Sequence, residues 1–291
     1  MCIRDSDNPG NIDRRQDDVS LRIGYTFGNG IALHSVSSYS RLDSIYEEDN
    51  DLSPVPFTVF RQNADARYVT QELRLEGAGA RTRWTAGAFY LDIDGTYLQA
   101  FDIQALGTPL QADYTLATQS WSGFGQLEYD FDERFTLTAG TRYTRDDKDY
   151  DYLRSCSGLC FLFTVPDSIG AAGRVVDSHS EGDWSGRLSL DYKPSPEQLY
   201  YLSINRGYKA FSYNAGFAGM APLAGVRFDG ETLLAFELGT KLQFWGNRAR
   251  FNAATFYYDY SAYQAFDPVS YTHLTLPTTA HGEIAVVAVP L

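Results

Sequence analysis

Residues 135–144 read FTLTAGTRYT, and this stretch decides the fold class. Every second residue from Phe135 to Tyr143 belongs to one set, which is Phe, Leu, Ala, Thr and Tyr, while the other set is Thr, Thr, Gly, Arg and Thr. Side chains two residues apart point to the same face of a strand, so this strand has one apolar and one polar face. Roughly ten segments of the chain show the same alternation, which predicts an all-β fold.

The links between these segments are alternately short and long. Short links such as Gly28-Asn29-Gly30 are typical of tight hairpin turns. Long polar links are expected at 42–67, 95–117, 145–181 and 208–230. Segments of about 10–13 residues suit strands that cross a bilayer at a tilt, whereas a soluble β-sandwich has shorter strands. The pattern predicts an antiparallel transmembrane β-barrel with turns at one end and loops at the other.

Charge and motif content exclude several classes of function. The formal net charge is −13, with acidic runs at 47–51 and 146–151, so nucleic acid is not an expected partner. These runs lack the spacing of a calcium loop and are expected to be solvated loop surface. The four histidines show no metal-ligand spacing and no G-x-S-x-G element is present, so we expect neither a metal site nor an enzyme.

The two ends of the chain differ from the rest. Residues 1–6 (MCIRDS) and 269–279 (VSYTHLTLPTT) match neither flank and resemble translated sequencing-adapter DNA. The chain opens without a secretory signal, and it contains no run of about 18 apolar residues that would form a transmembrane helix. We therefore expect 7–268 to be the partial barrel and 1–6 and 269–291 to be foreign to it.

Five segments carry a resemblance to a known family. The most extended is 199–211 (LYYLSINRGYKAF), and the others are 71–75 (QELRL), 135–143 (FTLTAGTRY), 231–243 (ETLLAFELGTKLQ) and 250–258 (RFNAATFYY). In this order they resemble strands of the β-barrel of TonB-dependent outer-membrane receptors. Together they cover most of residues 19–264. One departure is Ala210-Phe211-Ser212, where the family usually has Pro-Gly-Gly in a variable loop.

The resemblance implies energised import across the outer membrane of a Gram-negative cell. A scarce solute such as a ferric siderophore or cobalamin would bind to loops and plug, and the TonB complex would act through the plug domain, which these residues do not include. The expected partners are therefore TonB, outer-membrane lipid and a small metal chelate, with the receptor a monomer. About ten strands are legible, against about 22 in a complete barrel. A passive porin-like barrel and a soluble all-β surface or carbohydrate-binding domain remain alternatives.

Cys156 and Cys160 lie in the longest expected link. Three intervening residues suit a small disulfide loop at an oxidising surface, which is the interpretation we favour over free thiols. A zinc site is the least favoured interpretation, because His179 is the only histidine nearby.

Aromatic residues are concentrated where the link 208–230 begins. Tyr208, Phe211 and Tyr213, with Phe217 beyond them, are candidate ligand contacts, since their rings can stack on a solute; packing within the loop is the alternative. The polar face of the strands holds further charged residues that either form a cross-strand ladder or are simply solvated in the lumen. They are Glu72, Arg74, Arg142, Arg187, Glu237 and Lys241.

Overall fold

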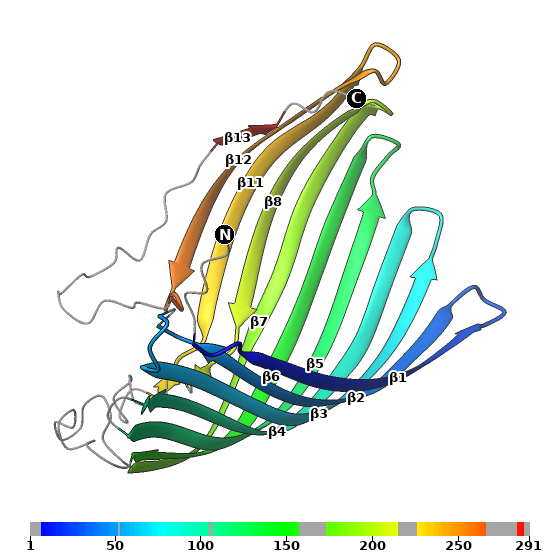
Figure 1. The fold of residues 1–291 in the computed structure, drawn as a ribbon. Helices are drawn as coiled ribbons and strands as arrows, with labels where there is room; N and C mark the ends of the chain where they lie inside the picture. Colours follow the sequence, from blue (N-terminus) through cyan, green and yellow to red (C-terminus); the bar gives the residue numbers. More distant parts are fainter. Residues whose placement is uncertain are drawn as a thin grey trace.

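The computed structural model describes residues 7–51, 53–104, 107–156, 173–214, 226–265 and 284–287. Within them the chain forms an antiparallel sheet of eleven strands in the order β1-β2-β3-β4-β5-β6-β7-β8-β11-β12-β13 (Figure 1). The strands are β1 (Asn11–Thr26), β2 (Ala32–Asp49), β3 (Thr58–Ala78), β4 (Thr82–Ile103), β5 (Thr108–Asp130), β6 (Phe135–Cys156), β7 (Gly173–Ser195), β8 (Gln198–Lys209), β11 (Glu231–Phe244), β12 (Ala249–Ser261) and β13 (Ile284–Val287). A two-stranded ribbon, β9 (Ser212–Tyr213) and β10 (Arg227–Phe228), lies between β8 and β11 in the chain.

The sheet is an open section of a barrel. It curves around a hollow, with β1 and β13 at the two ends of the strand order (Figure 1). Within the described residues, ten of the eleven strands of this sheet have 12 or more residues. The predicted antiparallel, incomplete barrel of about ten strands is therefore confirmed, and the described residues include no plug domain. None of the described residues belongs to a helix long and apolar enough to cross a bilayer.

Tight turns join the strands at one end, which we call the turn end. In the first hairpin, the Phe27 amide donates to the carbonyl of Ile31 at 2.8 Å and the Gly30 amide donates back to Phe27 at 2.9 Å. Gly30 adopts a φ of 82°, a left-handed conformation that costs glycine little. The predicted hairpin turn is therefore confirmed at this position. The opposite end of the sheet, where the longer links lie, is the loop end.

Three of the expected long links are largely strand instead. The backbone ladder of antiparallel hydrogen bonds continues through polar sequence, because it does not depend on side chains. The expectation was wrong for the strand extensions at 42–49, 58–67, 95–103, 108–117, 145–156 and 173–181. Alternation persists there as well, but with the apolar residues on the other face, as in Asp149-Tyr150-Asp151-Tyr152.

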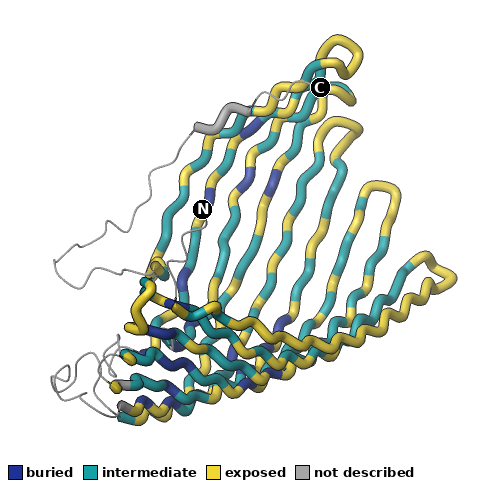
Figure 2. Tube along the Cα trace, in the orientation of Figure 1, coloured by how far each residue is buried: buried dark blue, intermediate teal, exposed yellow. Residues whose placement is uncertain are grey.

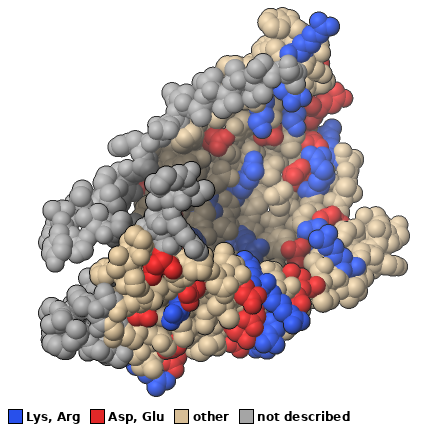
Figure 3. Space-filling model, viewed as in Figure 1, with Lys and Arg blue, Asp and Glu red and all other residues tan. Residues whose placement is uncertain are grey.

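The pairing register assigns each side chain to one of two faces. Leu190 lies opposite Leu137 on β6 and Leu202 on β8, and this face, which we call the outer face, carries large exposed apolar side chains. Arg187 and its neighbours at alternate positions belong to the inner face. Figure 3 looks into the hollow of the sheet and shows charged side chains on its wall.

Buried residues gather at the loop end of the strands. Most of the sheet is intermediate or exposed, as expected of one layer (Figure 2). The buried hydrophobic cluster contains Ala112, Tyr150, Tyr152, Phe211, Tyr213 and Val226. It is the packed core of the described residues, and it forms where the β9–β10 ribbon lies against the sheet.

The interpretation of the two chain ends as foreign stays a prediction. Residues 1–6, 266–283 and 288–291 lie outside the described residues. The four residues of β13 pair antiparallel with 252–255 of β12.

Candidate functional site

Two rows of aromatic side chains border an apolar band on the outer face. The turn-side row includes stacked Phe135 and Tyr192, with ring centroids 4.5 Å apart. The loop-side row includes Tyr143 and Trp184, whose centroids are 4.9 Å apart. Further members of the turn-side row are Tyr25, Phe27, Tyr129, Phe131 and Tyr200, and further members of the loop-side row are Tyr39, Tyr90 and Trp121.

Exposed aliphatic side chains fill the band between these rows. On β7, Leu188 is 48% exposed and lies midway between Trp184 and Tyr192. Leu202 on β8 and Leu238 on β11 are similarly exposed and pair with each other across the sheet. A soluble surface rarely shows a continuous apolar patch of this kind, so the band indicates a nonaqueous contact.

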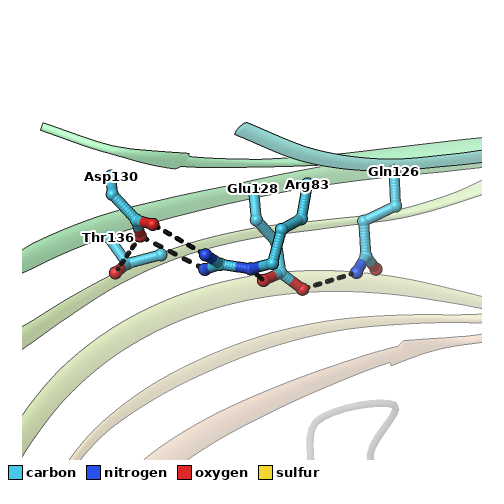
Figure 4. A network of polar contacts seen from close by, with 5 residues as sticks. All are labelled: Arg83, Gln126, Glu128, Asp130 and Thr136. Atoms are coloured by element: carbon cyan, nitrogen blue, oxygen red, sulfur yellow. Dashed lines mark hydrogen bonds and ion pairs between the residues drawn. The ribbon is translucent and has the colours of Figure 1, made fainter. Parts of the chain in front are cut away.

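The inner face behind this band is polar. Near the turn end, the Arg83 guanidinium donates to Glu128 at 2.9 Å and to Asp130 at 2.7 Å (Figure 4). Asp130 also accepts a hydrogen bond from Thr136 on the next strand, and Glu128 accepts one from Gln126. The network links β4, β5 and β6 and contains no aliphatic side chain.

The predicted charged residues of this face form local clusters rather than one ladder. Arg74 contacts Glu72 at 3.1 Å and Glu76 at 2.7 Å. The Arg142 guanidinium lies 5.5 Å from the Phe89 ring centroid and 5.6 Å from that of Phe124. Of the remaining residues, Glu237 accepts a hydrogen bond from Tyr201, and Lys241 lies 5.8 Å from the centroid of the same ring.

At the loop end the inner face changes character. On β3, β4 and β5, the described inner positions beyond the loop-side row hold no charged residue. These positions are Ala66, Ala64, Gln62, Phe60 and Thr58 on β3, Ile93, Gly95, Tyr97, Gln99, Phe101 and Ile103 on β4, and Thr118, Leu116, Tyr114, Ala112 and Leu110 on β5. Tyr97 and Tyr114 stack with centroids 4.9 Å apart. Burial raises the pKa of each of these two phenols to about 12, so both remain protonated and neutral.

Tyr150 is the centre of the aromatic cluster at this end. Its side chain is 2% exposed, and its ring stacks on Tyr213 at 4.3 Å with an interplanar angle of 7°. Tyr152 lies parallel on the same strand at 5.8 Å, and Tyr114 is 6.0 Å away on β5. Burial raises the pKa of the Tyr150 phenol, which keeps this cluster uncharged.

Lys148 joins the ribbon to the sheet. Its ammonium group donates to the carbonyl oxygen of Phe211 at 2.5 Å and lies 4.9 Å from the centroid of that ring. Burial lowers the pKa of Lys148, while Asp146 and Glu181 act in the opposite direction. The His179 ring packs edge-on against Phe211 at 4.7 Å. The first residues of the β8–β11 link are thus held against β6 and β7.

The structure brings two of the predicted aromatic residues, Phe211 and Tyr213, together at this cluster. Phe211 is fully buried and Tyr213 is 7% exposed, so both contact the wall of the sheet here. Tyr208 lies beside Glu181, and its buried hydroxyl has no hydrogen-bond partner among the described residues. Phe217 lies outside the described residues.

The predicted disulfide falls at the edge of the described chain. Cys156 is the last residue of β6, and Cys160 lies outside the described residues, so the disulfide stays a prediction.

Sequence reasoning missed the wall tyrosines Tyr97, Tyr114, Tyr150 and Tyr152. They fall in the segments 95–117 and 145–181, which were interpreted as long links between strands. The alternation in residues 149–152 (DYDY) was the available signal, since it places both tyrosines on one face of a strand.

Comparison with known proteins identifies the family. The family described as "TonB dependent receptor-like, beta-barrel" matches residues 3–284, nearly the whole chain. The chain belongs to this family. TonB-dependent receptors are an outer-membrane family of receptors rather than of enzymes, and the five segments that resemble their strands all lie in the match.

Solved structures of such receptors share the fold. The ferric yersiniabactin uptake receptor FyuA from Yersinia pestis aligns with a TM-score of 0.68 and 20% identity over 85% of this chain and 36% of its own. The siderophore receptor PiuA from Acinetobacter baumannii aligns with a TM-score of 0.64 and 14% identity over 85% of this chain and 40% of its own. The copper transporter OprC gives a TM-score of 0.62 and 11% identity, with 87% and 40% covered. The chain therefore spans less than half the length of these receptors.

Proposed function

We propose that this chain forms part of the wall of an outer-membrane transporter that imports a scarce solute with energy delivered through TonB. The observation that carries the proposal is the apolar band between two aromatic rows, backed by a polar inner face. Membrane barrels present this arrangement to lipid, with aromatic side chains at both interfaces.

The dimensions of the band support this location. Trp184 and Tyr192 are eight residues apart on β7, which corresponds to about 27 Å along a strand. At the tilt of about 35–45° that is usual in membrane barrels, this length covers about 20 Å of height, close to the apolar band of about 25 Å. The turn end then faces the periplasm and the loop end faces the medium.

The solute we propose is a metal chelate such as a ferric siderophore. Two of the similar solved structures are a ferric yersiniabactin uptake receptor and a siderophore receptor, while a third is a copper transporter. The aromatic cluster at the loop end offers stacking surfaces to such a solute. Tyr208, Phe211 and Tyr213 belong to this proposed receiving region, although Phe211 and Tyr213 must move before they expose their rings.

The partners we propose follow from the same assignment. The polar clusters of the inner face near the turn end would contact a plug domain, through which TonB would act on a monomeric receptor. Arg83 and Arg74 would supply positive charge to such an interface, and the carboxylates around them would supply negative charge. The Cys156–Cys160 disulfide would brace the link between β6 and β7 in the oxidising medium.

The experiment is an uptake assay with the full receptor encoded by the gene that carries this chain. It is expressed in a strain without its own ferric siderophore receptors, and iron is supplied as radiolabelled ferric catecholate or ferric hydroxamate. We expect uptake that is lost when TonB is deleted, with the receptor in the outer-membrane fraction. Uptake that persists without TonB would indicate a passive porin, and a receptor that remains soluble would contradict the membrane location.

A further inference from the structure

Arg142 is an arginine of the inner face that no carboxylate of the described wall neutralises. Arg74 and Arg83, nearer the turn end, each contact two carboxylates of the wall itself. The Nε of Arg142 donates to the hydroxyl of Thr144 at 3.2 Å, and its two terminal nitrogens have no hydrogen-bond partner among the described residues. The residue is half-buried, so part of the cost of desolvating its charge is uncompensated. This position therefore suits an anion from outside the wall.

Two phenyl rings hold the Arg142 guanidinium in place. Its Cζ atom lies 5.5 Å from the ring centroid of Phe89 on β4 and 5.6 Å from that of Phe124, the residue directly opposite Arg142 on β5. Both distances are typical of cation–π contacts. Stacking on a ring orders the guanidinium without using its N–H donors, so the planar fork stays available to a ligand and is already positioned.

Gly87 makes room for this arrangement. It lies opposite Phe124 in the ladder of β4 and β5, and a Cβ atom here would lie 2.6 Å from the Phe124 ring and 2.6 Å from the carbonyl oxygen of Leu73. A larger residue would therefore displace a ring on which Arg142 stacks. The glycine, the two rings and the arginine come from three adjacent strands, so the sheet itself fixes the position of the guanidinium.

Arg142 lies near the boundary between the two parts of the inner face. It immediately precedes Tyr143 of the loop-side row, and the aromatic cluster around Tyr150 lies farther toward the loop end on the same strand. An anion that passes from the loop end into the lumen would meet this guanidinium where the polar wall begins. A protein domain inside the lumen would reach the same group from the turn end.

We propose that Arg142 is an anion-binding site in the wall of the lumen and that it pairs with a carboxylate through two parallel N–H···O hydrogen bonds. The fork of a guanidinium matches a carboxylate in this geometry. Two sources can supply the carboxylate, namely an acidic side chain of a domain that fills the lumen or an acid group of the imported solute. The inference rests on the proposed function, because it requires a lumen that holds such a domain or conducts such a solute.

The first arm of the test measures solute binding by the full receptor. Ferric citrate carries carboxylates and an uncharged ferric trihydroxamate does not, and quenching of protein fluorescence follows the binding of each. If the solute supplies the carboxylate, Arg142→Gln should weaken ferric citrate binding by about ten-fold or more, because charge-assisted hydrogen bonds are lost. Trihydroxamate binding should not change. Arg142→Lys should recover only part of the ferric citrate affinity, since lysine keeps the charge but lacks the fork.

The second arm measures amide hydrogen exchange of the full receptor without solute. If a domain in the lumen supplies the carboxylate, Arg142→Gln should speed exchange in one segment of that domain by about ten-fold, because a contact that holds the segment is lost. Arg145→Gln is the matched control in both arms. Arg145 lies on the same strand but on the outer face, where it pairs with Asp147 at 3.3 Å, and its substitution should change neither measurement.

The two arms together decide the inference. Unchanged ferric citrate affinity in Arg142→Gln, together with unchanged exchange in the lumen domain, would overturn it. Faster exchange confined to β4, β5 and β6 would also overturn it, since Arg142 would then only stabilise the wall. Import that does not require TonB would contradict the proposed function, whereas the comparison of Arg142→Gln with Arg145→Gln would still report on the anion site.

Discussion

The turn-end and loop-end halves of the same strands have opposite sidedness. On β7, the outer face carries Leu188 and Leu190 in the turn-end half but Arg174 and Ser178 in the loop-end half. On β6, the inner face changes from Arg142 to Tyr150 and Tyr152 over the same boundary. The backbone ladder is continuous across the change, so the environment of each half, and not the strand pairing, determines which face is apolar.

The proposed membrane location would explain the two patterns. A turn-end outer face in lipid, around a wet lumen, would favour apolar residues that face outward. Beyond the loop-side row the outer face carries charges that pair across strands, as Arg67 does with Asp94 at 3.2 Å and Arg174 with Asp151 at 2.6 Å, which suits contact with water. The inner face there is covered by the ribbon, which makes it a small core.

The largest effect is expected at the core of the loop-end half. Tyr150→Ala removes a fully packed ring and should lower the local unfolding free energy by about 3–5 kcal/mol. The measurement is the rate of trypsin cleavage after Arg154, whose side chain is buried in the native protein. We expect an increase of about two to four orders of magnitude, because cleavage follows local opening.

The membrane half should not respond to this change. The heat-modifiable band of the receptor in gel electrophoresis is expected to persist in Tyr150→Ala. Loss of that band together with the protease resistance would mean that the two halves unfold as one unit, which would remove the distinction between them.

A charge in the middle of the apolar band should have the next largest effect. Leu188→Arg places a guanidinium at mid-height in lipid and is expected to cost about 2–4 kcal/mol of folding stability. Urea unfolding of the receptor in lipid vesicles measures this difference. Val176→Arg is the matched control, since Val176 is 69% exposed on the same face of the same strand but beyond the loop-side row. Equal costs for the two variants would contradict the assignment of the band to lipid.

A smaller effect is expected for an aromatic pair on the outer face. Tyr143 and Trp184 form a pair in the loop-side row, at 4.9 Å and 51°. A double-mutant cycle to alanine should give a coupling of about 0.5–1.5 kcal/mol in vesicles, in the range of aromatic pairs elsewhere. The coupling should not depend on any ligand bound at the loop end. A coupling energy between Tyr143 and Trp184 that depends on the bound ligand would show that the loop-side row responds to the solute and does not only contact lipid.

The smallest effect is expected in the polar network near the turn end. Arg83 is more than half exposed and contacts Glu128 and Asp130 at a solvated wall (Figure 4). Exposed ion pairs contribute little to stability, so Arg83→Gln should unfold at the same urea concentration as the wild type. A clear loss of stability would mean that this ion pair is buried in the full receptor, for example against the proposed plug domain.

The sequence predicted the turn-end half well and the loop-end half poorly. In the turn-end half, alternation as in 135–144 matches an apolar outer face and a polar inner face, and tight turns mark where each strand ends. In the loop-end half, acidic residues such as Asp149 and Asp151 suggested solvated loops, although they occupy the outer face of a strand whose inner face is packed.

The aromatic site was predicted only in part. Phe211 and Tyr213 stand out in a sequence segment rich in glycine and aromatic residues, whereas their partner Tyr150 lies more than 60 residues earlier in the chain. That contact depends on the ribbon reaching across β7, a tertiary arrangement that local pattern does not encode. The register of β6 with β7 was needed to recognise it.

The central claim is that the outer face changes from lipid to water at the loop-side aromatic row. A spin-label scan along the outer face of β7 tests it directly, with single cysteines at Val176, Ser180, Trp184 and Leu188 in the full receptor in vesicles and the native cysteines replaced. We predict relaxation by oxygen at Leu188, relaxation by a water-soluble nickel chelate at Val176 and Ser180, and a crossover near Trp184. Uniform access of the nickel chelate from Val176 to Leu188 would contradict the account.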